Sequence, residues 1–132
     1  EYVNQVGKTS HGGEYTPLMA AAWQEHFQIF KYLIEQGEAD PNIARSNGWN
    51  ALHYAAQNNR TTTELIELLL THMTLDSINK KDRGFTPLDW AYHNRSPIRQ
   101  EIIALLRSKG GKANYFDENG RNVGEGNGDL NH

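Results

Sequence analysis

Two short stretches of the sequence contain residue types that could do chemistry. The first, GKTSHGG at 7–13, has the Gly-Lys-Thr core of a phosphate-binding loop. The full motif, G-x-x-x-x-G-K-[ST], needs a glycine where this chain has Tyr2, and no helix start follows Thr9. We therefore interpret the stretch as an elongated hairpin and not as a nucleotide site.

The second stretch contains Asp89 and His93, which lie four residues apart. On a helix, side chains at this spacing share one face and could both contact a metal ion. A metal or catalytic site needs further convergent groups, and the sequence offers no evident third ligand, no Ser–His–Asp arrangement and no cysteine. We therefore predict no metal, no cofactor and no catalytic residue, and hence a protein that is not an enzyme.

A sequence motif that occurs three times in the chain predicts its first helices, and Asp89 and His93 lie in the third copy. It is TPLMAAAWQEH at 16–26, NALHYAAQNNR at 50–60 and TPLDWAYHNRS at 86–96. The copies start 34 and 36 residues apart, a period typical of repeat architectures. Thr16, Asn50 and Thr86 are good helix N-caps, worth ~1 kcal/mol each. Pro17 and Pro87 suit the first helical position, so each phrase predicts a short first helix.

A second, longer helix is predicted in each unit. The three segments are FQIFKYLIEQ at 27–36, TELIELLLTH at 63–72 and PIRQEIIALLRSK at 97–109. Thr61, with a glutamate three residues later, predicts a capping box, and Ser96 predicts a cap just before a proline. Gly37 and Gly110 are expected to end their helices in the left-handed conformation, whereas Met73 must end its helix differently.

Glycine-containing turns separate the helix pairs. They are NIARSNGW at 42–49, NKKDRGF at 79–85 and NYFDENGR at 114–121, which predict projecting hairpins. A unit of hairpin, short helix, turn and longer helix cannot bury its apolar face alone. The units must therefore stack on one another.

This organisation resembles the ankyrin repeat family, whose units begin with G-x-T-P-L-H-x-A-A and end with G-A-D-x-N. The matching segments are GWNALHYAA at 48–56, GFTPLDWA at 84–91, ADPN at 39–42 and EIIALLRSKGGKAN at 101–114. The resemblance implies an all-α solenoid of stacked helix-turn-helix units with projecting β-hairpin loops. Met19 and Asp89 replace the usual histidine, which is kept as His53, so its hydrogen bond at the helix start is in question in two units.

The resemblance also predicts how the chain is divided. We expect an ankyrin repeat domain over 1–123 and a flexible polar tail over 124–132. The expected units are 13–42, 46–79, 82–114 and a partial fourth hairpin over 114–123. Residues 1–5 resemble the end of another unit, so we expect a monomeric piece of a longer chain.

Because ankyrin proteins usually bind partners through hairpin tips and the concave first-helix face, the resemblance implies a protein–protein interaction module. Equivalent positions of successive units form three ladders on that face. They are Tyr15, Trp49 and Phe85 before the cap; Trp23, Gln57 and His93 seven residues after it; and Gln24, Asn58 and Asn94 eight residues after it. Trp23 is the preferred binding residue, while the aromatic ladder could serve binding or packing. Tyr54 and Trp90 are expected to fill space between units.

Composition excludes several classes of partner and location. The net charge of −3 comes without a basic cluster, which argues against nucleic acid or membrane partners. The apolar run at 64–70 is far shorter than the ~20 residues of a membrane span. With no cysteine and no visible signal peptide, we expect an intracellular, cytoplasmic protein, or one that a microbe delivers into a host cytosol.

Two alternatives to partner binding stay open at this point. The stack could be a structural spacer or an autoinhibitory segment of a larger multidomain protein or microbial effector. It could also be a substrate, because the resemblance places Asn42, Asn79 and Asn114 at the loop position that asparaginyl hydroxylases modify in some ankyrin proteins.

Overall fold

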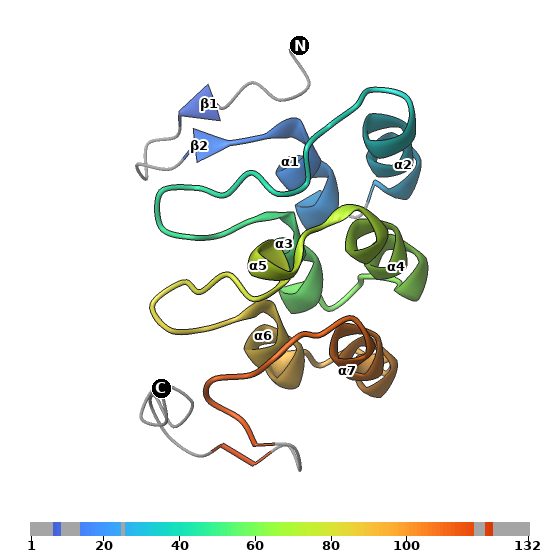
Figure 1. Ribbon diagram of the computed structural model, residues 1–132. Coiled ribbons are helices and arrows are strands. Elements are labelled where there is room, and N and C mark those ends of the chain that lie inside the picture. Colours follow the sequence, from blue (N-terminus) through green and yellow to red (C-terminus); the bar gives the residue numbers. More distant parts are fainter. Residues whose placement is uncertain (1–6, 9–13, 25, 118–120, 123–132) are drawn as a thin grey trace.

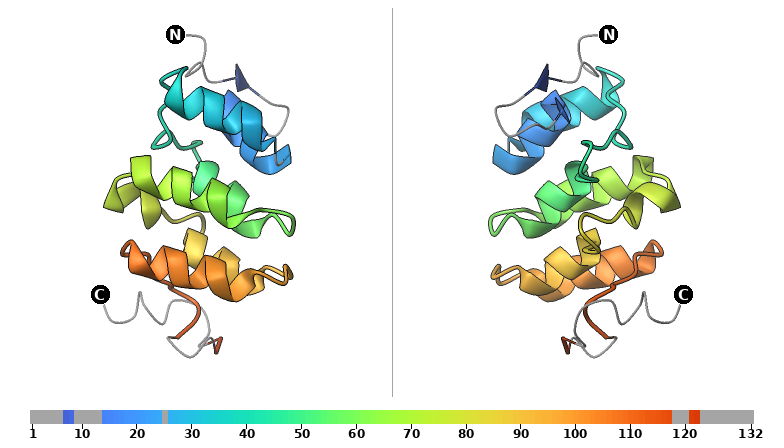
Figure 2. Two further views of the ribbon diagram at one scale, coloured as in Figure 1. Left: turned by 90° about the vertical axis from the view of Figure 1, so that its right-hand side faces the viewer. Right: turned by 90° about the vertical axis from the view of Figure 1, so that its left-hand side faces the viewer.

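The protein is a stack of helix pairs. A computed structural model describes residues 7–8, 14–24, 26–117 and 121–122, with side chains from Thr16 onward. The first helices are α1 (Pro17–Gln24), α3 (Ala51–Gln57) and α6 (Pro87–His93), and the second helices are α2 (Phe27–Glu35), α4 (Thr63–His72) and α7 (Arg99–Ser108). First and second helices form two columns (Figure 1), and the three pairs lie one above another (Figure 2). The predicted all-α repeat fold is confirmed.

The first helices begin at the predicted caps. The Thr16 hydroxyl accepts the N–H of Met19 at 3.2 Å, and the Asn50 side chain accepts the N–H groups of Leu52 and His53. His53 Nδ1 in turn accepts the N–H of Asn50 at 3.1 Å, which completes a capping box.

The third unit builds the same box with a different residue. The Thr86 hydroxyl accepts the N–H of Asp89, and Asp89 Oδ2 accepts the N–H of Thr86 at 2.9 Å. A carboxylate at this position therefore makes the hydrogen bond that the histidine makes in the second unit.

The starts of two second helices differ from the prediction. Thr62, not Thr61, caps α4 by accepting the N–H of Leu65, while Thr61 is buried and its hydroxyl has no partner among the described residues. α7 begins two residues after the predicted Pro97, because residues 96–98 form a turn in which the Ser96 hydroxyl accepts the N–H of Ile98. The predicted Thr61 cap is therefore wrong by one residue.

The helix ends show one confirmed and one wrong prediction. Gly110 has φ +89°, so it ends α7 in the left-handed region as predicted. Gly37 does not take this conformation; the neighbouring Glu38 does, with φ +56°. Met73 ends α4 in an extended conformation.

A short additional helix, α5 (Leu75–Ile78), follows α4 in the second unit. Thr74 caps it by accepting the N–H of Ser77 at 3.2 Å. The sequence analysis missed this helix because a four-residue element has too few positions to show a helical period.

The hairpins project on the first-helix side of the stack (Figure 1). β1 (Gly7–Lys8) pairs antiparallel with β2 (Glu14–Tyr15), so the lysine of the GKTSHGG stretch lies in a hairpin strand as interpreted, although residues 9–13 lie outside the described part. Later hairpins are closed by single bridges, among them Ala44 with Asn50 and Asp82 with Phe85. The predicted tail at 124–132 also lies outside the described residues.

Neighbouring hairpins approach each other closely at Gly48. Its φ is +100°, and a Cβ there would lie 2.3 Å from the carbonyl oxygen of Lys81 on the next hairpin. Only glycine fits this position without moving backbone.

The core lies between the columns and between the units. Ala22, Ala55 and Ala91 of the first helices are fully buried, which lets α3 contact both α1 and α6. On α2, by contrast, Ile29 and Tyr32 are exposed. In the described part of the chain, no helix is long and apolar enough to cross a bilayer.

Candidate functional site

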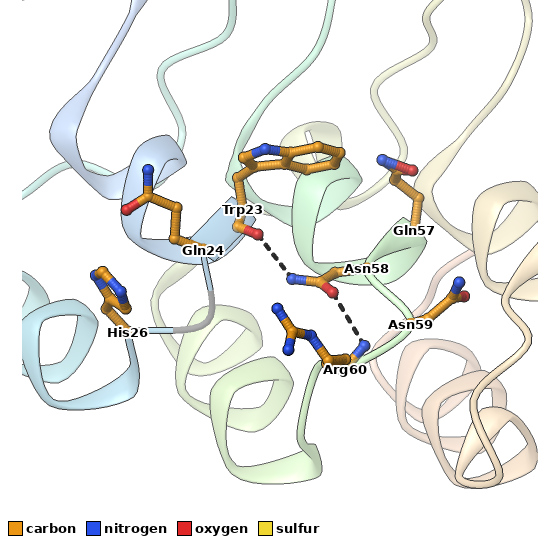
Figure 3. A pocket seen from close by; sticks show the side chains of 7 residues that line it. All are labelled: Trp23, Gln24, His26, Gln57, Asn58, Asn59 and Arg60. Carbon is orange, nitrogen blue, oxygen red and sulfur yellow. Dashed lines mark hydrogen bonds between the residues drawn. The ribbon is translucent and has the colours of Figure 1, made fainter.

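A groove opens where the first helices of units one and two end. It has a volume of about 680 Å³ and is lined by Trp23, Gln24, His26, Gln57, Asn58, Asn59 and Arg60 (Figure 3). We call it the turn groove, because its lining comes from the ends of α1 and α3 and from the turns that follow them. Four of the nine predicted contact residues meet here.

Trp23 is the main apolar surface of the turn groove. Its side chain is 47% exposed. The indole packs edge-on against Tyr54, with ring centroids 5.8 Å apart. Tyr54 is 8% exposed, as expected for an aromatic between units, and its hydroxyl accepts a hydrogen bond from Arg45 at 2.6 Å. A fixed tyrosine therefore holds one edge of the indole while the rest meets solvent.

Asn58 forms a bridge between units beneath Trp23. Its Nδ2 donates to the carbonyl oxygen of Trp23 at 2.9 Å and to that of Ala22 at 3.3 Å, and its Oδ1 accepts the N–H of Arg60 at 2.9 Å (Figure 3). The last carbonyls of a helix have no partner within the helix, so Asn58 satisfies two of them from the next unit. Its amide shapes the turn groove and is already committed to these bonds.

Asn94 was predicted on the surface, and this is wrong. It is 3% exposed, and its Nδ2 donates to the carbonyl oxygens of Ala56 at 2.7 Å and Asn58 at 3.0 Å. Asn94 thus ties α6 to the end of α3 in the way that Asn58 ties α3 to α1. A buried amide with these bonds is not available to a partner.

The aromatic ladder packs along the hairpin side. Trp49 is half-buried, lies 4.9 Å from Tyr54 and 5.3 Å from Trp90 between ring centroids, and donates its indole N–H to Asp82. Phe85 stacks on Tyr115 at 4.1 Å with an 18° interplanar angle. These contacts favour the packing alternative for Trp49 and Phe85. The Tyr15 side chain lies outside the described residues.

The remaining predicted residues are accessible. Gln24 is exposed and Gln57 half-buried at the turn groove, and His93 is exposed beside Phe85 and Phe116, with centroids 6.3 Å and 5.1 Å away. His93 does not act with Asp89 as a ligand pair, because the carboxylate of Asp89 is fully buried in hydrogen bonds. Its acceptors take the N–H groups of Thr86, Asn114 and Tyr115.

Sequence reasoning missed His26, Asn59 and Arg60. They occupy the turns directly after the ladder positions, at the ends of the repeated phrases QEH and NNR. The sequence therefore contained a signal for these residues, because they lie one or two positions after the third ladder (Gln24, Asn58 and Asn94). The Asn59 side chain also accepts the N–H of Arg95 at 3.0 Å, which brings the next turn beside the turn groove.

His53 is the titratable group with a clear shift in the described part. Burial lowers the pKa of its imidazole from 6.5 to about 4, against smaller opposing effects from the backbone at Phe85 and Lys80 and from the charge of Asp82. The ring is fully buried and Nδ1 accepts a hydrogen bond, so the neutral ring carries its proton on Nε2. This histidine supports a helix start.

The three loop asparagines are hydrogen-bonded to neighbouring units. Asn42 Oδ1 accepts the N–H of Thr74 at 2.9 Å, and Asn79 contacts Gly110 and Lys112 at 3.0 and 2.7 Å. The Asn114 side chain donates to the Gly84 carbonyl at 2.8 Å and is 4% exposed. A modifying enzyme would have to open these bonds to reach the asparagines.

Comparison with known proteins finds a matching protein family. A family model described as ankyrin repeats (3 copies) matches residues 18–117. The chain is 34% identical over 108 residues to the ankyrin repeat and SAM domain-containing protein 6 of Rattus norvegicus. The aligned region covers 80% of this chain and 12% of that protein.

Proposed function

The chain belongs to the ankyrin repeat family, and from this premise we propose that it is a non-catalytic module that binds a protein or peptide through its hairpin tips and first-helix face. Members of this family generally serve protein–protein interaction and are generally non-catalytic. The turn groove carries the proposal, because it gathers an exposed tryptophan, two glutamines and an arginine at the end of two first helices.

The chemistry of the turn groove suits a polypeptide. Aromatic side chains give a large contact area for little loss of conformational entropy and often dominate binding energy. Gln24 and Gln57 each offer a donor and an acceptor that match the N–H and C=O groups of an extended backbone. Trp23, Gln24 and Gln57 therefore stay as proposed contacts at the turn groove, where His26 and Arg60 are added. His93 stays as a proposed contact at the exposed end of α6, and Asn58 and Asn94 are assigned to support.

The surroundings of the turn groove are preorganised. Asn58 ties its floor to the carbonyl oxygen of Trp23, and Tyr54 fixes the indole edge. A surface that is already ordered loses little conformational entropy on binding, which favours affinity for a given contact area.

Affinity capture with surface variants tests this function. We expect the domain to retain one or more proteins from an extract of its source cells, and Trp23→Ala to lose them. Tyr32→Ala is the matched control, because Tyr32 is also an exposed aromatic, 62% exposed, but lies on the second helix α2. Trp49 is unsuitable for this purpose, since its contacts with Tyr54 and Trp90 support the stack.

A second variant separates binding from folding. Gln57→Ala removes a groove amide without touching the Trp23–Tyr54 contact, and it should weaken capture while thermal unfolding stays cooperative. Equal capture by the wild type, Trp23→Ala and Gln57→Ala would show that the partner binds elsewhere or that the domain is a spacer.

The spacer alternative has one observation in its favour. The relative in Rattus norvegicus is much longer than this chain, which aligns to 12% of it, and its name records a second kind of domain. If the partner is another segment of the same protein, Trp23→Ala should weaken the contact between the domain and that segment.

A further inference from the structure

Building on the proposed function, we infer that the segment bound at the turn groove is an acidic, extended polypeptide with an apolar side chain that rests on Trp23. The inference comes from a separation of charge that the fold creates between the two columns of helices in the first two units, where the turn groove lies.

The first-helix column is basic although the chain as a whole is acidic. The described residues of the hairpins, first helices and inter-helix turns, at 7–8, 14–24, 26, 42–62 and 79–98, include seven Lys or Arg and three Asp or Glu. The segments that form the second helices of the first two units and their following loops, residues 27–41 and 63–78, contain one basic and six acidic residues, whereas α7 and its loop, residues 99–113, contain four basic and one acidic residue. The two columns (Figure 1) therefore differ in charge in the first two units, which are the units that form the turn groove.

Two of the three described acidic residues on the basic side are removed from solvent. Asp82 is 1% exposed and accepts hydrogen bonds from the Trp49 indole and from the Arg83 guanidinium. Asp89 is fully buried and accepts backbone N–H groups from Thr86 and Asn114. Asp82 pairs with Arg83, so these two opposite charges cancel, whereas Asp89 is held inside the stack by backbone N–H groups. The basic residues of this side therefore still outnumber the acidic ones that a partner meets.

One arginine side chain lines the turn groove and a second arginine lies on the adjacent turn. Arg60 forms part of its lining, and Arg95 follows on the adjacent turn, where its backbone N–H bonds the side chain of Asn59. A guanidinium group pairs with a carboxylate through two parallel hydrogen bonds, which gives orientation as well as attraction. Acidic residues on either side of an apolar anchor at Trp23 would therefore match this arrangement.

The spacing of the basic residues at the turn groove favours a polypeptide over a phosphate polymer. Arg60 and Arg95 stand singly there, whereas Lys80, Lys81 and Arg83 gather on a hairpin, where Arg83 pairs with Asp82. Duplex DNA carries a charge about every 1.7 Å, and proteins that bind it neutralise many phosphates at once with clustered Lys and Arg. A single arginine in the groove lining beside Gln24 and Gln57 matches the sparser carboxylates and regular amides of a peptide.

Two synthetic peptides test the inference. Both have the same length and the same Trp and Leu positions; one has Asp and Glu between them and the other has Lys and Arg. Fluorescence anisotropy with the whole domain should show that the acidic peptide binds about tenfold or more tightly at low salt, and that the difference shrinks as salt rises to about 0.5 M. Equal affinities, or no binding of the acidic peptide, would overturn the inference.

Matched charge variants locate the effect. Arg60→Gln with Arg95→Gln should weaken the acidic peptide about fivefold. Lys31→Gln with Lys109→Gln removes the same charge from exposed positions in α2 and after α7, and should leave its affinity unchanged. An equal loss in both double variants would mean that only net charge matters, which contradicts a site at the turn groove.

Further outcomes of these binding experiments distinguish a failure of this inference from a failure of the proposed function on which it rests. If Trp23→Ala weakens both peptides equally and the charge pattern makes no difference, the groove binds peptides and only the acidic preference is wrong. If Trp23→Ala has no effect while the arginine variants do, the proposed groove contact fails. Tighter binding of an oligo-dT strand or of phosphatidylserine vesicles than of the acidic peptide would assign the basic side to nucleic acid or lipid and refute the inference.

Discussion

Acidification should destabilise this protein through His53. The pKa of the buried imidazole is lowered from 6.5 to about 4, so the native state binds a proton less readily than the unfolded chain. The stability that this group contributes is complete above about pH 6.5 and is lost as pH falls towards about pH 4. From the two pKa values, a change from about pH 7 to about pH 5 should remove about 2 kcal/mol of unfolding free energy.

The largest cause is the burial of the imidazole, and protonation also changes the hydrogen bond that His53 accepts. A second proton on the ring must go to Nδ1, which accepts the N–H of Asn50, and Nε2 has no hydrogen-bond partner among the described residues. Charging the ring therefore removes a capping-box bond and keeps a charge out of water.

The matched variant is His53→Gln. A glutamine oxygen can accept the Asn50 N–H in a capping box but does not titrate. Urea denaturation followed by circular dichroism at the two pH values should show wild type losing about 2 kcal/mol more than the variant. The other histidines and the carboxylates are common to both proteins, so the difference isolates His53.

A direct titration completes the test. The imidazole of His53 followed by NMR in the wild type should titrate below about pH 5. An ordinary histidine pKa in the folded protein, or equal pH dependence of wild type and His53→Gln, would refute the account of burial given above.

Three further predictions concern stability, each measured by urea denaturation with the wild type alongside. Gly48→Ala should destabilise by more than about 1 kcal/mol, because the residue has φ +100° and its Cβ would meet the Lys81 carbonyl; a neutral effect would contradict the close hairpin contact. Asn94→Ala should lower stability by about 1–3 kcal/mol by leaving the Ala56 carbonyl unpaired, and a loss below this range would count against the bridge between units. Thr62→Ala should cost about 1 kcal/mol as the true cap of α4, whereas Thr61→Val should be near neutral; the reverse order would restore the cap expected from sequence.

The helix starts could be predicted because their signals are local. Thr16, Asn50 and Thr86 cap helices through bonds to residues two or three positions away, so the sequence alone contains both partners. The choice between Thr61 and Thr62 is different. Both are followed by helix-forming residues, and the burial of Thr61 in the tertiary structure decides which hydroxyl meets the helix.

The site was harder to predict because exposure depends on neighbouring units. Trp23, the residue preferred from sequence, is exposed at the turn groove, but Asn94 is buried although it stands in the same kind of ladder. Its partners are carbonyls 36 and 38 residues earlier, and no local pattern records that contact. The basic side of the stack has the same origin, since its charges are scattered in sequence and are brought together only by the fold.

The asparagine bridges have a mechanical consequence. Asn58 and Asn94 fasten each pair to the one before it at the inter-helix turns, and Asn42 and Asn79 fasten each pair to the next at the loops. The middle pair, α3 with α4, is thus anchored on both sides, while each outer pair is anchored on one. A tension applied across the described stack should therefore separate an outer pair first, so that the force needed would rise and fall in steps.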